Sequence, residues 1–129
     1  MAVSKTSLSA GEIIRGILIA DPEVMQRAKK VYPVVEDTAE LPYIVYRRTQ
    51  LEQNTVKGRT GADTVGIEIL CYTEHYTEGV ELAEAVRAAL DGVQGESDGL
   101  VMRSCYLSDS EEGWQDDAFV QQLVFNVKI

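Results

Sequence analysis

The chain has 129 residues, a length that suits one domain with a sizeable core that needs neither disulfides nor a metal. Its 12 basic and 21 acidic side chains give a formal net charge of -9, the wrong sign for a protein that binds nucleic acid by neutralising phosphates. The sequence has no signal sequence and no run of ~20 apolar residues, so we expect a soluble protein that folds in a cytoplasm, with no membrane contact.

The first part of the chain is predicted to be helical. Ser9 followed by Glu12 resembles a capping box before an apolar helical face, which predicts a helix over about 9–20. Asp21 followed by Pro22 is typical of an N-cap with proline at the first helical position. A short basic turn or helix should therefore follow the first helix.

The hydrophobic pattern then changes from helical to alternating, which indicates strands. A short edge strand is predicted at 31–36 (VYPVVE), because Pro33 has no N–H for a strand ladder. Stronger strands are expected at 42–51 and 63–72, with a mobile loop over 53–63 between them. The later of these strands places four residues on the face toward the core: Val65, Ile67, Ile69 and Cys71.

The clearest helix of the chain follows this strand. Thr77 is predicted to cap its start and Gly92 to end it. Its apolar face comprises Gly79, Leu82, Ala83, Val86, Leu90 and Val93. A flexible connector over 92–99 should then lead to two final strands at 99–107 and 118–129.

The predicted order of elements is helix, short helix, three strands, helix and two strands. This order indicates the fold class α+β, with an antiparallel or mixed sheet of about four to five strands and helices packed on one face. The sequence shows no internal repeat and no sign of a second domain. We therefore predict a single domain over residues 1–129.

A cysteine, a carboxylate and the only histidine of the chain occur together in CYTEHY (71–76). Cys71, Glu74 and His75 could ligate a metal or activate a nucleophile. However, alternation directs Cys71 toward the core, no third or fourth metal ligand is evident, and catalytic partners usually come from distant segments. Cys105 is not expected to form a disulfide with Cys71 in a reducing compartment. We therefore predict no enzyme activity, no catalytic or metal site and no cofactor.

Two segments of the chain concentrate charge. The acidic segment 108–117 does not fit an EF-hand loop, because its glycine falls at the fifth rather than the sixth position, so we predict a solvated hairpin turn. Basic side chains cluster on and after the second strand: Arg47, Arg48, Lys57 and Arg59. Such a cluster is usually solvated, but on an acidic chain it is also a candidate partner interface.

The segments LPYIVYRRTQ and GIEILCYTEHYTEGVELAEAVRAAL, separated by a glycine-bearing loop, follow an early helix and the pieces ADPEV and VYP. This arrangement resembles the tail-completion and head-tail joining proteins of tailed bacteriophages and prophages. The matching pieces are Ala20 to Val24, Tyr32 to Pro33, Leu41 to Tyr46 and Ile67 to Leu90. The resemblance covers nearly the whole chain and places CYTEHY at a strand end and helix start, with Tyr72 and Tyr76 as packing groups.

The resemblance implies a structural virion protein rather than an enzyme, with the fold of tail terminators. It implies a homo-oligomeric ring, a hexamer, at the head-proximal end of the tail, in contact with the tail tube protein and the head-connector protein. Assembly would take place in the host bacterial cytoplasm. DNA could pass through a net negative ring without sequence-specific binding. Lys57 and Arg59 would then supply charge complementarity to an acidic tube protein or a neighbouring subunit, and Arg47 and Arg48 belong to the same candidate partner interface.

Two other interpretations of the sequence stay open at this point. The chain could be a small α+β binding or scaffold protein that acts as a dimer and is unrelated to phage. It could also be a small hydrolase or metal enzyme that uses Cys71 and His75. Stoichiometry separates a six-fold ring from a dimer, and metal analysis of the purified protein tests the enzyme interpretation.

Overall fold

The computed structural model describes residues 5–34, 40–53, 55–56, 59–60 and 63–129, and in 55–56 and 59–60 it describes the backbone alone. The helical elements are the 3-10 turn η1 (Ser7–Ser9), α1 (Ala10–Ala20), α2 (Pro22–Met25) and α3 (Tyr76–Leu90). The strands are β1 (Lys30–Pro33), β2 (Tyr43–Glu52), β3 (Thr55–Val56), β4 (Arg59–Thr60), β5 (Thr64–Thr73), β6 (Gly95–Ser97), β7 (Leu100–Met102), β8 (Ser104–Gln115) and β9 (Ala118–Lys128). None of the helices in these described residues is long and apolar enough to cross a membrane.

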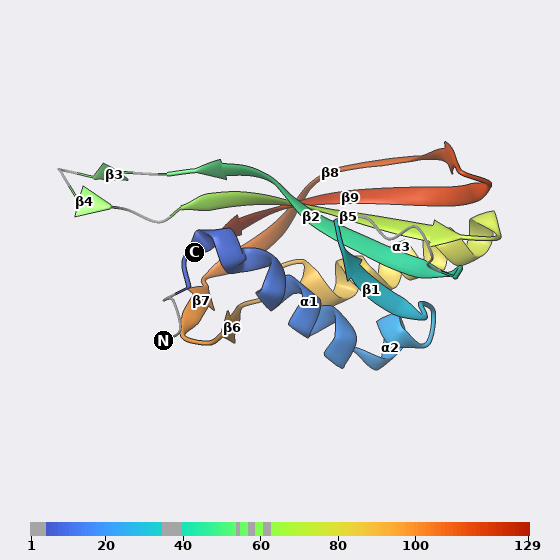
Figure 1. The fold of residues 1–129 in the computed structure, drawn as a ribbon, viewed down its shortest axis with the longest axis horizontal. Coiled ribbons are helices and arrows are strands. Elements are labelled where there is room, and N and C mark those ends of the chain that lie inside the picture. The colour runs from blue at the N-terminus through green and yellow to red at the C-terminus, as the bar shows by residue number, and fades with distance from the viewer. Residues whose placement is uncertain (1–4, 35–39, 54, 57–58, 61–62) are drawn as a thin grey trace.

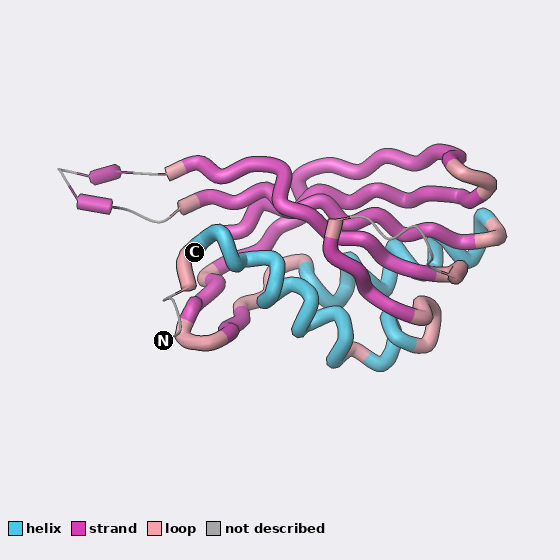
Figure 2. The backbone as a smooth tube through the Cα atoms, in the orientation of Figure 1, coloured by secondary structure: helices cyan, strands magenta, loops and turns pink. Residues whose placement is uncertain are grey.

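Five strands form one mixed sheet in the order β1-β2-β5-β9-β8. β1 is parallel to β2, and the other neighbouring pairs are antiparallel. The helices lie on one side of this sheet, as Figure 1 and Figure 2 show. The predicted α+β class is therefore confirmed. β1, which contains Pro33, lies at an edge of the sheet as the sequence predicted.

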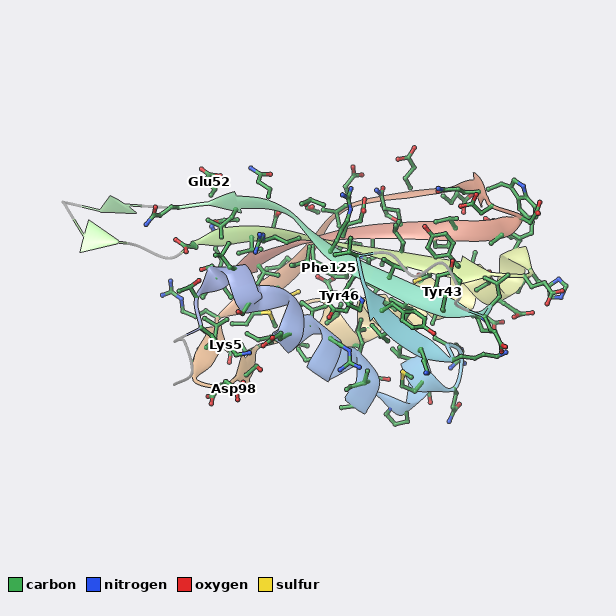
Figure 3. All side chains as sticks on the ribbon, viewed as in Figure 1. Lys5, Tyr43, Tyr46, Glu52, Asp98 and Phe125 are labelled. Carbon is green, nitrogen blue, oxygen red and sulfur yellow. The ribbon has the colours of Figure 1, made fainter. Side chains whose placement is uncertain are left out.

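The hydrophobic core lies between the helices and the sheet face that turns toward them, here called the inner face. All four core residues predicted in β5 are fully buried there: Val65, Ile67, Ile69 and Cys71. Leu82, Val86 and Leu90 of α3 are also fully buried, as predicted. Phe125 of β9 is the largest fully buried side chain and lies centrally in this layer (Figure 3). Because removal of apolar surface from water drives folding, this layer stabilises the fold.

The opposite face of the sheet, here called the outer face, carries a smaller apolar cluster that includes Val45, Tyr72 and Val120. Tyr43 stacks on Tyr72 with ring centroids 4.8 Å apart, and Tyr32 packs edge-on against Tyr43 at 6.0 Å. Tyr72 is therefore a packing group. This aromatic contact stabilises the end of the sheet from which α3 begins.

The first two helices begin in different ways. Asp21 is the N-cap of α2 as predicted, because its Oδ1 accepts hydrogen bonds from the N–H groups of Glu23 (2.9 Å) and Val24 (3.2 Å). Ser9 makes no capping hydrogen bond through its side chain, so the predicted capping box is wrong. The chain already turns as η1 before α1, so Ser9 lacks the extended backbone that a capping side chain requires.

α3 begins and ends within a residue or two of the predicted positions. It starts at Tyr76, before Thr77, so the predicted Thr77 cap is wrong. His75 occupies the N-cap position without a side-chain hydrogen bond, and the Thr73 hydroxyl donates to the His75 carbonyl oxygen at 2.9 Å. Gly92, predicted to end the helix, lies just beyond the C-cap residue Asp91 with a φ of 81°, a left-handed conformation that favours glycine.

Two segments predicted as loops contain short strand pairs. Segment 53–63, predicted as a mobile loop, holds β3 and β4, which pair with each other. The predicted mobility of this segment stays a prediction, because residues 54, 57–58 and 61–62 lie outside the described residues. The connector 92–99 holds β6, which pairs with β7 across a turn at Asp98 and Gly99. Both turn residues have a positive φ, as a two-residue hairpin turn requires.

The acidic segment 108–117 is mostly strand rather than turn. β8 continues through it to Gln115 and pairs with β9, with one irregularity after Leu107. Only Asp116 and Asp117 form the turn, with φ of 52° and 59°. The strand was not evident from the sequence because both faces of β8 are exposed beyond Leu107, so no apolar alternation marks it.

Candidate interaction surfaces

The predicted basic cluster does not form one patch in the described part of the molecule. Arg47 and Arg48 are consecutive in β2 and therefore lie on opposite faces of the sheet. On the outer face, the Arg47 guanidinium binds the buried Glu68 carboxylate at 2.7 Å, and the Gln122 amide donates to the same carboxylate at 2.5 Å. Arg48 donates to the carbonyl oxygen of Leu8 at 2.8 Å. Both arginines thus have partners within the chain.

The other two members of the cluster lie in the connection between β2 and β5. Lys57 lies outside the described residues, and of Arg59 only the backbone is described, as part of β4. β3 and β4 extend beyond the helical layer in Figure 1. Glu52, at the end of β2, lies at the start of this extension in Figure 3. The interface role of Lys57 and Arg59 stays a prediction.

Arg47→Met is expected to lower the free energy of unfolding by about 1–2 kcal/mol, because it leaves the buried Glu68 carboxylate without its cationic partner. About half of the Arg47 side chain is exposed, so water screens the pair and keeps the effect in this range. Urea unfolding followed by circular dichroism measures it. Arg48→Met is the matched control, with an expected change within about 0.5 kcal/mol. Equal stability of Arg47→Met and wild type would show that the pair contributes nothing.

The two cysteines and the histidine do not form a common site. Cys71 and Cys105 are free and buried, and burial raises the pKa of each thiol to about 12, so neither is a thiolate nucleophile near neutral pH. His75 is exposed at the start of α3, where its Nε2 lies 3.8 Å from the Glu78 carboxylate. Within the described ranges, no group of three or more His, Cys, Asp or Glu side chains could hold a metal ion.

β8 forms an edge of the sheet, and all of its charged side chains are acidic. Two hydrogen bonds cover its first half: Leu107 N–H donates to Asp91 Oδ1 at 3.0 Å, and Gly92 N–H donates to the Cys105 carbonyl oxygen at 2.6 Å. In the part of the chain that the structure describes, β9 is the only strand that pairs with β8, so no strand pairs with the other edge of β8. Its second half and the following turn, here called the acidic edge, carry Asp109, Glu111, Glu112, Asp116 and Asp117.

An aromatic cluster flanks the acidic edge where α3 begins. Phe119 packs edge-on against Tyr76 and Trp114, with ring centroids 5.8 Å and 4.8 Å apart. The Tyr76 hydroxyl and the Gln121 amide donate to the Glu112 carboxylate at 3.0 Å and 2.8 Å, and the hydrogen bond to Glu112 raises the pKa of Tyr76. Trp114 still exposes 58% of its surface. Exposed tryptophan and tyrosine beside charged groups are typical of protein contact surfaces.

The opposite edge of the sheet carries a groove between β1 and α1 with a volume of about 370 Å³. The groove, here called the basic groove, is lined by apolar and basic side chains, among them Arg15, Ile19, Met25, Lys29, Lys30 and Val31. Ile19 exposes 44% of its surface. Lys29 pairs with Glu40 at 3.2 Å, whereas Arg15 and Lys30 form no ion pair with any described residue. The two edges of the sheet therefore differ in charge.

Residues 12–129 match the protein family described as tail completion protein gp17. The chain belongs to this family. The match spans α2, α3, most of α1 and all five strands of the large sheet. The resemblance that the sequence analysis identified is thereby confirmed.

A solved structure supports the fold of this tail completion protein independently. A chain described as part of the virion of a native gene transfer agent particle is similar over 95% of this chain and 98% of its own length. The TM-score is 0.81 and the sequence identity is 17%, so the likeness concerns the fold. No curated protein matches the chain. Family membership makes the chain a structural component of a phage-like tail. As such, the chain assembles with other virion proteins.

Neither sheet edge of the tail completion protein was identified as a surface from the sequence. The acidic edge was predicted only as a turn. The basic groove was not predicted, because α1 and β1 form it together and their contact is tertiary. The one signal in the sequence was the run of basic residues that ends at Lys30 in an otherwise acidic chain.

The tail completion protein is expected to purify without a stoichiometric transition metal. Cys71 is buried on the inner face and His75 is exposed, so the two side chains do not share a site. Elemental analysis of the purified protein measures bound metal, and His75→Ala should leave the melting temperature and assembly unchanged. Near-stoichiometric zinc that is lost in His75→Ala would support the metal-enzyme interpretation instead.

Proposed function

We propose that this tail completion protein forms a closed ring of six copies at the head-proximal end of the tail and joins the tail to the head. Membership of the tail completion family supports a role at the tail. The observation that carries the ring is that the two edges of one sheet, β1 and β8, present unlike surfaces. A contact between unlike surfaces is heterologous, and its repetition closes into a ring when the rotation between copies permits.

The ring would contact the tail tube protein on one side and the head-connector protein on the other. The β2–β5 hairpin is our candidate for one of these contacts, because β3 and β4 extend beyond the helical layer (Figure 1). Lys57 and Arg59 of this connection would attract an acidic partner, whereas Arg47 and Arg48 already bind Glu68 and the carbonyl oxygen of Leu8 within the chain. A net charge of -9 on each copy would let DNA pass through the ring with little attraction to it.

The purified protein is expected to assemble into rings of six copies. Native mass spectrometry gives the number of copies, and electron microscopy of the same sample gives the symmetry. A closed dimer would contradict the ring and support a scaffold role. A chain that stays monomeric both in solution and on isolated tails would also contradict it.

The role in joining is tested on particles made without this protein. We expect full heads that lie apart from tails, or tails of uncontrolled length, and restoration of joined particles when the purified protein is added. Electron microscopy of the two preparations gives the fraction of joined particles. Normal joining in the absence of the protein would contradict the proposal, whatever the number of copies in the purified assembly.

A further inference from the structure

We propose that the acidic edge of one copy docks in the basic groove of the next copy, with Trp114 as the apolar anchor. This inference rests on the proposed ring and assigns its subunit interface. The two surfaces lie at opposite edges of the same sheet, β8 and β1, so neither can contact the other within one chain. One contact of this kind per copy leaves both edges occupied in a closed ring.

The charges of the two surfaces are complementary and available. Glu111 and Asp109 of the acidic edge form no ion pair with any described residue, and the same holds for Arg15 and Lys30 of the basic groove. Opposite charges across an interface favour the correct encounter, and like charges oppose the wrong one. The acidic edge would therefore associate with the basic groove and would repel a second acidic edge, which disfavours a two-fold β8-to-β8 dimer.

Apolar groups accompany the charges on both surfaces. On the acidic edge, Trp114 exposes 58% of its surface beside the aromatic cluster. In the basic groove, Ile19 exposes 44%, and Met25 and Val31 contribute apolar lining. A large aromatic side chain in an apolar pocket with charges around it is the usual arrangement of the residues that dominate a protein interface.

Strand direction is consistent with this contact. β8 runs antiparallel to β1, because one parallel and three antiparallel pairings separate them in the sheet. A neighbour in the same orientation would thus bring its β8 antiparallel to β1, with outer face next to outer face. Pro33 removes one N–H from β1, so few ladder hydrogen bonds can form there. We therefore assign the contact mainly to side chains.

Cross-linking tests the contact directly. Lys30→Cys and Glu111→Cys are prepared as separate proteins and mixed, and a short bismaleimide is added. The native thiols are buried, so reaction should be confined to the introduced ones. We expect a cross-linked pair in the mixture and none in either variant alone. Glu96→Cys on β6 replaces Glu111→Cys in the control mixture, which should not cross-link to Lys30→Cys.

Charge exchange is the second test. Lys30→Glu or Glu111→Lys alone should weaken assembly by about tenfold, because like charges then face each other. The double variant should return to within about threefold of wild type, because every contact of a head-to-tail ring would again join opposite charges. Equal melting temperatures of all three variants establish that folding is unaffected. Sedimentation over a concentration series measures assembly.

The outcomes separate this inference from the proposed ring. Rings without the cross-link between positions 30 and 111, or without recovery in the double variant, would overturn the docking contact and leave the ring in place. Efficient cross-linking of Glu111→Cys alone would overturn it in favour of a two-fold contact between acidic edges. The absence of any closed wild-type assembly would overturn both proposals.

Discussion

Phe125→Ala is expected to lower the free energy of unfolding by about 3–5 kcal/mol, the largest effect of any single change considered for this protein. Phe125 is completely buried on the inner face. It lies opposite Ile67 of β5 on one side and Leu107 of β8 on the other. Truncation removes the apolar contacts of the phenyl group and leaves a cavity that three rigid strands cannot close. Urea unfolding followed by circular dichroism gives the change.

The chain supplies a matched control for this change. Phe119 is the only other phenylalanine, lies on the same face of β9 and is half-buried in the aromatic cluster beside the acidic edge. Phe119→Ala should cost about 1–2 kcal/mol, because its site already contacts water and retains little cavity. If both variants lost the same stability, the core would not be centred on Phe125. Phe119 packs against Trp114, so assembly of Phe119→Ala into the six-copy ring tests the interface that Trp114 is proposed to form.

Leu82→Ala is expected to lower the free energy of unfolding by about 2–5 kcal/mol. Leu82 is fully buried on the side of α3 that faces β5 and β9. α3 is the longest helix of the described structure, so loosening its contact with the sheet should weaken the whole core rather than a local segment. Assembly of the ring would then fail through unfolding of the subunit. The denaturant midpoint should move to lower concentration with little change in slope.

Leu8→Ala is the control for this second change. Leu8 exposes 62% of its surface in η1, so the same substitution there should alter stability by no more than about 0.5 kcal/mol. A midpoint for Leu82→Ala equal to that of wild type would show that α3 packs on the sheet through another face. A large effect of Leu8→Ala would show that η1 is buried in the assembled protein.

The buried elements of this protein were predicted well because their pattern is local. In β5, every second residue from Val65 to Cys71 enters the core, so a period of two was visible in the sequence. In α3, the apolar face repeated with the helical period and placed Leu82 correctly. Asp21 with Pro22 specified a helix start through hydrogen bonds between near neighbours. Each of these signals depends on residues a few positions apart.

The exposed strands were predicted poorly for the same physical reason. β8 beyond Leu107 has no buried face, so the alternation that reveals β5 is absent and the sequence predicts a turn there. This strand is defined by its hydrogen-bond ladder with β9. The turn at Asp116 and Asp117 brings the two strands together. Hydrogen bonds of the main chain are insensitive to side-chain hydrophobicity, so composition gave no warning of them.

The α+β class and the buried faces follow from the sequence alone, and so does the tail completion family, through the pattern around Leu41–Tyr46 and Ile67–Leu90. The candidate surfaces depend on tertiary contacts. Arg47 turned out to pair with Glu68, and the basic groove arises where α1 meets the edge strand β1. Helix and strand periodicity is encoded in neighbouring residues, whereas ion pairs, grooves and sheet edges depend on which distant segments the fold brings together.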